Sequence, residues 1–258
     1  MQKFIIETEV LVSDHDQQAF CVDITGQDAK HMSRVLRLKI GAVVSMTNGK
    51  GMDYRGEIVE MDKERVRVKI LEEKPSEAES SLGLTICSAM LKDKKMDGII
   101  KELTQLGVSK WVPFFSQRSV PSPAAKKLSR RHERWQSIAK ESLKQCRRSC
   151  EVEIPFPLSF EQVMDLAKVY DHCIAFWENA HAPLVLNSGA DEKGAGKSAI
   201  VLVGPEGGFT GDEIKTAEQA GFNAYSLGPR ILRAETAALT AAVLVQYLIG
   251  DLGGGGVG

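Results

Sequence analysis

The densest group of residues suited to chemistry follows an apolar run at residues 199–203. Gly204-Pro205-Glu206-Gly207-Gly208 comes next, and a helix-like pattern begins at Gly211. Open α/β sheets bind ligands where a strand ends and a helix begins, and glycines let a ligand lie close to the backbone. The alternative is a tight turn without a ligand, but three glycines in five residues favour a ligand site.

A second loop of the same kind covers residues 226–237, between a short strand-like run and a long helical pattern. Ile231 and Leu232 offer an apolar wall to a flat ring. Arg233 and Glu235 bring charge to the start of the helix. Taken alone, this loop is better explained as an ordinary helix start, where Glu is favoured anyway. Because both loops follow strand ends, we expect them to share one pocket.

Other ligand motifs are absent or incomplete. The pocket loop is not G-x-G-x-x-G, so the dinucleotide fingerprint is missing. The stretch 194–198 is similar to a phosphate-binding loop, but Asp191 stands where the first glycine belongs and the strand follows the loop. The five histidines show no metal-ligand spacing, and Cys146 and Cys150 lack the two further ligands that zinc requires. We therefore expect no metal.

The composition is that of a globular protein. Hydrophobic residues make up 43% of the 258 residues and charged residues 26%, which excludes disordered, collagen-like and coiled-coil classes. No apolar run is long enough to span a membrane, and the N-terminus lacks the apolar core of a secretory signal. Five scattered cysteines without a C-x-x-C pair indicate reduced thiols, so we expect a cytoplasmic protein with no membrane partner.

The net charge of −1 hides a segregation of charge along the chain. Residues 110–149 hold eleven Lys or Arg against two acidic residues, whereas residues 150–258 hold six basic and fourteen acidic residues. Such a block is typical of a surface that binds a polyanion such as RNA, and a solvated helix face explains it equally well. Further candidate phosphate contacts are Arg34, Arg37, Lys92, Lys94 and Lys95.

Two domains of different type are expected to hold these residues. Alternating runs with Gly-rich turns, such as 42–46 and 65–70, predict a small β-barrel or sandwich. The polar stretch 72–81 predicts a linker. From residue 82 onward, apolar strand-like runs alternate with helical patterns, which predicts an α/β domain with a mainly parallel sheet.

Six motifs occur in order along nearly the whole chain. They are H-M-S-R-V-L-R-L from His31, K-D-K-K-M-D-G-I-I-K-E-L-T-Q-L-G-V from Lys92, the Arg118-Ser119 step, E-R-W-Q-S-I-A from Glu133, V-G-P-E-G-G-F from Val203 and S-L-G-P-R-I-L-R-A-E-T-A from Ser226. With these motifs the chain resembles the bacterial 16S ribosomal RNA uridine-N3 methyltransferases of the SPOUT superfamily.

The resemblance implies an α/β fold with a SPOUT-type trefoil knot, preceded by a small all-β PUA-like barrel. The RNA-binding barrel would occupy residues 1–73, the methyltransferase domain residues 74–252, and a flexible Gly-rich tail residues 253–258. It also implies a homodimer, the cofactor S-adenosylmethionine, and 16S ribosomal RNA of the assembled small ribosomal subunit as substrate.

The same resemblance assigns residues to the cofactor site. The residues expected to bind the cofactor are Leu202, Gly204, Glu206, Gly207, Gly208, Leu227, Gly228, Ile231 and Leu232. The backbone of the last four would hold the adenine. From charge and position rather than from the resemblance, the candidate RNA contacts are His31, Arg34, Arg37, Lys92, Lys94, Lys95, Arg118, Arg147 and Arg148. For the lysines, Arg34 and Arg37 the alternative is a solvated surface, and a lone histidine such as His31 is more often structural. Gln105, Lys144, Arg147 and Ala234 depart from the family pattern but leave both cofactor loops intact.

The expected reaction is direct transfer of a methyl group to N3 of an unpaired or flipped uracil. Arg118 and Arg233 are candidates to stabilise charge on the uracil oxygens. Glu206 or Glu235 would accept the proton or pair with the positive sulfonium, and the sequence does not choose between them. The alternative from another class is a non-catalytic RNA-binding ribosome assembly factor with a degenerate cofactor pocket. The intact glycine loop at 204–208 argues against it.

Overall fold

The computed structural model describes residues 3–6, 11–13, 20–62, 64–92, 94–119, 124–185 and 198–253. The chain divides into two compact units. The first unit joins residues 1–79 to 143–151, and the second joins residues 80–142 to 152–258. The expected domain bounds, with a division after residue 73 and residues 143–151 in the later domain, stay a prediction. The loop at 194–197 and the tail beyond Gly253 lie outside the described residues.

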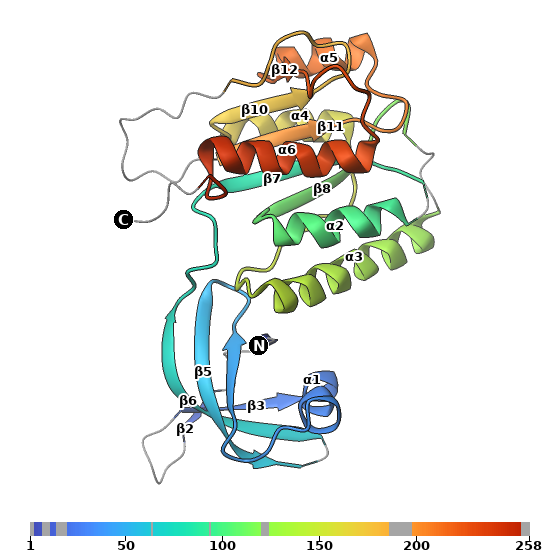
Figure 1. Cartoon of the computed structure of the whole chain (residues 1–258). Coiled ribbons are helices and arrows are strands. Elements are labelled where there is room, and N and C mark those ends of the chain that lie inside the picture. Colours follow the sequence, from blue (N-terminus) through green and yellow to red (C-terminus); the bar gives the residue numbers. More distant parts are fainter. Residues whose placement is uncertain are drawn as a thin grey trace. The chain divides into compact units, whose positions relative to one another are not determined.

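The first unit is built on one curled, mixed sheet (Figure 1). Its strand order is β1-β4-β5-β6-β3-β2, and only the β1–β4 pairing is parallel. The strands are β1 (Lys3–Ile5), β2 (Leu11–Ser13), β3 (Phe20–Thr25), β4 (Val43–Thr47), β5 (Met52–Met61) and β6 (Arg65–Pro75). Strict alternation buries Val66 and Val68 against Ile58, because successive side chains of a strand point to opposite faces.

The predicted linker at 72–81 starts too early. Strand β6 continues to Pro75, which pairs with Met52 at the start of β5. The residues from Glu72 to Pro75 are exposed, so their polar character marks a solvated strand end rather than a break in the sheet. A helical pair, α1 (Gly26–Lys30) and the π-helix η2 (His31–Val35), follows β3 and carries the first of the six motifs.

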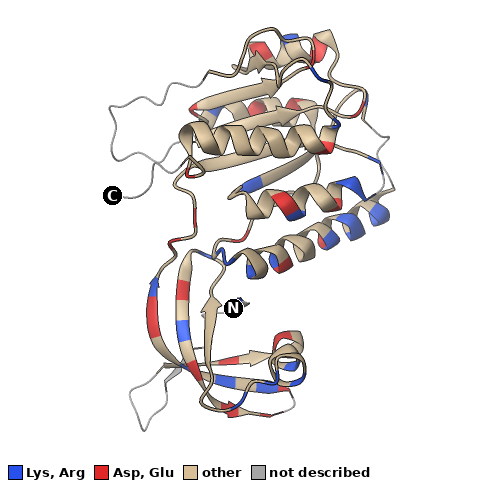
Figure 2. Ribbon diagram, viewed as in Figure 1, with Lys and Arg blue, Asp and Glu red and all other residues tan. Residues whose placement is uncertain are grey.

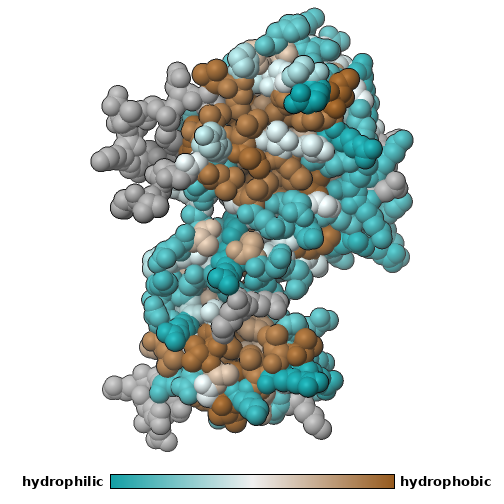
Figure 3. Space-filling model, in the orientation of Figure 1, coloured by the Kyte–Doolittle hydropathy of each residue, from teal (hydrophilic) through white to brown (hydrophobic). Residues whose placement is uncertain are grey.

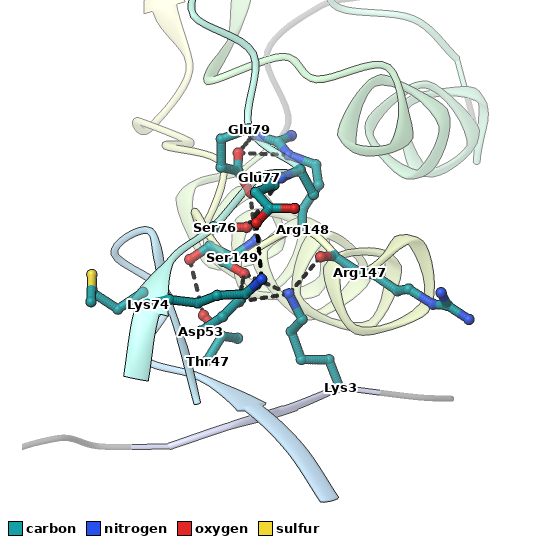
Figure 4. Close-up of polar contacts among 12 residues, drawn as sticks. Lys3, Thr47, Asp53, Lys74, Ser76, Glu77, Glu79, Arg147, Arg148 and Ser149 are labelled. Carbon is teal, nitrogen blue, oxygen red and sulfur yellow. Dashed lines mark hydrogen bonds and ion pairs between the residues drawn. The ribbon is translucent and has the colours of Figure 1, made fainter. Parts of the chain in front are cut away.

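A buried lysine fastens residues 143–151 to the sheet of the first unit. The ammonium of Lys3 donates hydrogen bonds to Asp53 Oδ1 at 2.7 Å, to the carbonyl oxygen of Arg147 at 2.6 Å and to Ser149 Oγ at 2.7 Å (Figure 4). Ser149 also donates to Asp53. Because all three donors of the ammonium are used, its burial is compensated.

The second unit contains a six-stranded, all-parallel sheet of order β12-β10-β11-β7-β8-β9. The strands are β7 (Gly83–Ala89), β8 (Lys110–Phe115), β9 (Leu158–Ser159), β10 (His172–Phe176), β11 (Ser198–Val203) and β12 (Asn223–Tyr225). Residues 199–203 of β11 are buried on both faces, as the continuous apolar run predicted.

Helices cover both faces of this parallel sheet (Figure 1). The helices are α2 (Lys95–Gln105), α3 (Ala125–Cys146), α4 (Phe160–Leu166), the 3-10 turn η3 (Ala167–Val169), α5 (Gly211–Gln219) and α6 (Ala234–Ile249). One core cluster joins the sheet to α2, α3 and α6, and a second joins the other face to α4 and α5. The α/β class with a preceding β-rich unit is therefore confirmed, and the knot stays a prediction. Within the described residues, no helix combines the length and apolarity needed to cross a membrane.

Candidate active site

A cavity of about 530 Å³ opens at the carboxyl ends of three neighbouring strands. Its walls come from residues 176–178 after β10, 203–208 after β11 and 226–232 after β12. These strands are parallel and adjacent, so their ends meet at one edge of the sheet. The volume lies in the range of about 300–1,000 Å³ that is typical of small-molecule sites. The two loops singled out in the sequence thus share one pocket, as expected.

Two glycines of the first loop lie close to side chains from other segments. Gly208 has a φ of +66°, and a Cβ atom there would collide with the carboxylate of Glu178. A Cβ atom on Gly207 would lie 3.3 Å from the Cβ of Arg118. The Nη1 of Arg118 donates a hydrogen bond to the carbonyl oxygen of Gly207 at 2.9 Å, which places this exposed arginine beside the loop.

A buried carboxylate joins the glycine loop to the segment that carries Arg118. Glu213 is only 3% exposed and forms a capping box with Thr210 at the start of α5. Its Oε1 also accepts a hydrogen bond from the backbone N–H of Gln117 at 2.9 Å. Sequence reasoning missed Glu213, although Thr210-x-x-Glu213 is the usual pattern of a capping box.

Two carboxylates converge on one lysine near the pocket. The Nζ of Lys95, at the start of α2, lies 2.9 Å from Glu206 Oε1 and 3.6 Å from Glu235 Oε2. The hydrogen bond to Glu206, with the charges of both carboxylates, raises the pKa of Lys95 above its usual value. Lys95 therefore stays charged at neutral pH.

Most of the expected cofactor residues line the cavity. Those that do are Gly204, Glu206, Gly207, Gly208, Leu227, Gly228, Ile231 and Leu232. Leu202 does not, because alternation along β11 turns it into the core against α4 and α5, and Val203 lines the cavity instead. Arg233 is exposed at the N-cap of α6, next to the lining residue Leu232.

Sequence reasoning also missed the third wall. Trp177 and Glu178 line the cavity just after β10. The position of β10 beside β11 is the signal that would have indicated that its carboxyl end reaches the same pocket. The indole N–H of Trp177 is buried and has no hydrogen-bond partner among the described residues. A buried donor without a partner is costly, and a ligand in the cavity is one way to supply the acceptor.

The expected RNA contacts divide into exposed and internally used residues. Arg34, Arg37, Lys92, Lys94 and Arg147 are exposed. Arg37 and Arg147 have φ angles of 51° and 65°, which are uncommon for residues other than glycine.

One expected contact is buried and another is half-buried. Arg148 is 4% exposed, and its guanidinium donates hydrogen bonds to Glu79 Oε2 at 2.8 and 3.0 Å (Figure 4). His31 packs edge-on against Phe4, and its Nε2 is buried. We therefore correct Arg148 to a structural residue of the first unit, and the RNA contact of the half-buried His31 stays a prediction. Lys95 differs from the exposed Lys92 and Lys94 because its ammonium forms ion pairs with Glu206 and Glu235.

The basic block lies mainly on α3, where Figure 2 shows a row of Lys and Arg along the helix. Trp135 and Leu128 face the core, while Lys126, Lys127, Arg130 and Lys140 are exposed. Not all of the charge is available: Arg134 pairs with Asp97 at 2.8 Å, and Arg131 stacks over the Trp135 ring at 5.2 Å. The face thus combines a solvated basic row with cations used in packing.

Comparisons with known proteins agree with this geometry. Residues 78–246 match the model of an RNA methyltransferase domain, and residues 24–71 match that of an RNA methyltransferase PUA domain. The ribosomal RNA small subunit methyltransferase E of Bacillus subtilis is 30% identical over 253 residues, which cover 96% of each chain.

Solved structures of similar proteins agree as well. The ribosomal RNA small subunit methyltransferase E of Neisseria gonorrhoeae, bound to S-adenosylmethionine, has a TM-score of 0.81 at 26% identity over 98% of this chain and 99% of that one. A methyltransferase of Legionella pneumophila, also in complex with S-adenosylmethionine, has a TM-score of 0.81 at 25% identity with the same coverage.

The fold and the pocket define an α/β RNA methyltransferase with a PUA domain. The chain belongs to the ribosomal RNA small subunit methyltransferase E family.

Proposed function

We propose that this protein transfers the methyl group of S-adenosylmethionine to N3 of a uridine in 16S ribosomal RNA, with the assembled small ribosomal subunit as substrate. The observation that carries the proposal is the cavity at the ends of β10, β11 and β12, in a chain that belongs to this methyltransferase family over nearly its whole length. The intact glycine loop argues against a non-catalytic assembly factor.

The residues around the cavity fit the cofactor. Gly207 and Gly208 leave room for close approach to the backbone, and Gly228, with a φ of 99°, does the same on the opposite loop. Ile231 and Leu232 present apolar surface suited to an adenine ring, and Ile231 is 91% exposed, as expected for a side chain that a ligand covers. Glu178 adds a carboxylate that can accept hydrogen bonds from ligand hydroxyl or ammonium groups.

Four side chains are proposed for the reaction. The cofactor supplies an electrophilic methyl group on a positively charged sulfur. Arg118 and Arg233 stabilise the negative charge that develops on the uracil oxygens as N3 loses its proton. Glu206, which lines the cavity, and Glu235, in the first turn of α6, are the candidates to accept that proton.

RNA binding is proposed for the exposed cations. Arg34, Arg37, Lys92, Lys94 and Arg147 hold phosphates, together with the exposed row on α3. N3 lies on the Watson–Crick edge of uracil, so the target base must leave any pair or stack before it enters the site. Affinity then depends steeply on salt concentration because phosphate neutralisation releases counterions.

A homodimer in the cytoplasm is the proposed working form. Figure 3 shows hydrophobic side chains gathered over α6. Tyr247 of this helix is 63% exposed, and Val243, one turn earlier, is also exposed. We propose that a second copy of the chain covers this face, because single large apolar side chains are common on surfaces but contiguous ones mark interfaces.

Two measurements test the proposed function. Calorimetric titration with S-adenosylmethionine should show one saturable site per chain, and incubation with small subunits that lack the modification should create one new block to primer extension. A methyl group on N3 causes such a block because it removes the pairing edge. Cofactor binding without any methylated base, on subunits or on naked RNA, would instead support the assembly factor.

A further inference from the structure

Lys95 connects two loops that the chain separates widely. Glu206 belongs to the loop after β11, and Glu235 belongs to the first turn of α6, which follows the loop after β12. The ammonium of Lys95 lies 2.9 Å from the first carboxylate and 3.6 Å from the second. One side chain thus links Glu206, which lines the pocket that the proposed function assigns to the cofactor, to the start of α6 behind the second pocket loop.

The second of these contacts reaches a buried oxygen of a half-buried carboxylate. Glu235 Oε2 is buried and has no hydrogen-bond partner among the described residues. Burying a carboxylate oxygen without a hydrogen bond is costly unless an opposite charge lies close by. The ammonium of Lys95 is the cation that the structure places within ion-pair distance of that oxygen.

The charge of the cluster disfavours a contact with RNA phosphate. One ammonium and two carboxylates carry a net charge of −1, so a phosphate that approached Lys95 would also meet Glu206 and Glu235. A net negative cluster instead complements the positive sulfur of the methyl donor. Lys92 and Lys94, which are exposed and outside this cluster, keep the expected phosphate role.

We propose that Lys95 is a positioning residue of the methyl-transfer site, which ties Glu206 to Glu235 and fixes the two pocket loops, and that it is not an RNA contact. The proposal rests on the proposed function for the identity of the reaction. The contact with the ammonium orients Glu206 at the cavity wall. Because the ammonium neutralises only one of the two carboxylates, the cluster keeps a negative charge that attracts a cation.

The test compares Lys95→Met and Lys95→Arg with Lys94→Met and Lys101→Met. Lys101 is an exposed lysine on the same helix with a single loose pair to Glu102, and it serves as the matched control. We expect Lys95→Met to lower kcat at least tenfold while KM for the ribosomal subunit stays within about twofold. We expect Lys95→Arg to recover most of kcat because a guanidinium can bridge two carboxylates.

RNA binding at several salt concentrations supplies a readout that needs no turnover. A lost phosphate contact reduces the slope of log K against log salt by about 1. Lys94→Met should show this reduction, and Lys95→Met should leave the slope of the wild type unchanged. A reduced slope in Lys95→Met, with kcat intact, would overturn the proposal and return Lys95 to the RNA surface.

A second readout follows the pair itself. In protein with isotope-labelled lysine, the side-chain resonance of Lys95 should titrate at a lower pH in both Glu206→Gln and Glu235→Gln than in the wild type, since each change removes one carboxylate. No movement in either variant would refute the cluster even if Lys95→Met fails to fold. If the two variants show these titration shifts but the wild type methylates no RNA, the result would contradict the proposed function and not the cluster.

Discussion

The carboxylate of Glu213 and the backbone N–H of Gln117 are joined by a hydrogen bond of 2.9 Å, across 96 residues of sequence. The same carboxylate caps α5 through Thr210. One buried side chain therefore sets the start of α5 and the position of the segment that carries Arg118. Because the group is 3% exposed and fully used, the site depends on a residue that does not line the cavity.

Glu213→Gln should weaken this link. The amide keeps one acceptor but places a donor where the carboxylate accepts hydrogen bonds, so we expect a loss of about 1–3 kcal/mol in the free energy of unfolding. Urea unfolding measures it, and Glu218→Gln on the same helix is the exposed control. An unchanged midpoint in Glu213→Gln would show that the contact with Gln117 does not order the loop.

Gly208→Ala should weaken cofactor binding without unfolding the protein. The residue has a φ of +66°, and the added methyl group would push against Glu178 in the wall of the cavity. Calorimetry should show S-adenosylmethionine affinity reduced at least about tenfold, or about 1.4 kcal/mol. Gly211→Ala is the control, since a Cβ there meets open space at the start of α5. Equal affinity in the two variants would place the cofactor elsewhere.

Arg233→Ala should separate catalysis from cofactor binding. The side chain is exposed at the N-cap of α6 and does not line the cavity, so its loss leaves the cofactor walls intact. We expect S-adenosylmethionine to bind with unchanged affinity while methylation falls by about 10²–10³-fold, the usual cost of losing a group that stabilises developing charge. Normal turnover would remove Arg233 from the mechanism.

Arg34 and Arg148 should respond to substitution in opposite ways. Arg34→Ala removes an exposed cation, so the salt slope of RNA binding should fall by about 1 with little change in stability. Arg148→Ala leaves Glu79 without its guanidinium partner and should lower the free energy of unfolding by about 3 kcal/mol, as the loss of one partner in a buried pair does. A stable Arg148→Ala protein with weakened RNA binding would reverse our correction.

The first unit should lose stability in acid through Asp23. The hydrogen bond from Arg67, with the charges of Arg67 and Arg65, lowers the pKa of Asp23 below its usual value of 3.8. A carboxylate whose pKa is lower in the folded state contributes stability above its unfolded pKa, and this contribution disappears as the pH falls through the folded pKa. The difference in urea midpoint between wild type and Asp23→Asn should therefore be constant above about pH 5 and shrink below pH 4.

Asp165→Asn provides the control for this acid effect, because its pair with Lys168 is solvent-exposed. The urea midpoint of Asp165→Asn should equal that of the wild type at every pH. A difference between wild type and Asp23→Asn that persists undiminished to pH 2 would show that the ionised carboxylate of Asp23 is not the stabilising group.

The elements that place the pocket could be predicted because their signals are local. Residues 199–203 are apolar without interruption, and the glycines that follow mark a strand end. Arg148 could not be recognised as buried, because its partner Glu79 lies 69 residues away. The local sequence around an arginine does not show whether its side chain is paired or solvated. Leu202 and Val203 differ only in which face of β11 they occupy, and that depends on which helices cover the sheet.

The fastening of residues 143–151 by Lys3 has a consequence for biosynthesis. A ribosome adds residues in order, so Lys3 and Asp53 leave the exit tunnel long before Ser149, the group that completes their network. The network around Lys3 is complete only when Ser149 has emerged, by which time the strands and helices from β7 to α3 are already outside. Until then Lys3 has only Asp53 as a partner in this network, and a fragment that ends at residue 79 would permanently lack the acceptors on Arg147 and Ser149.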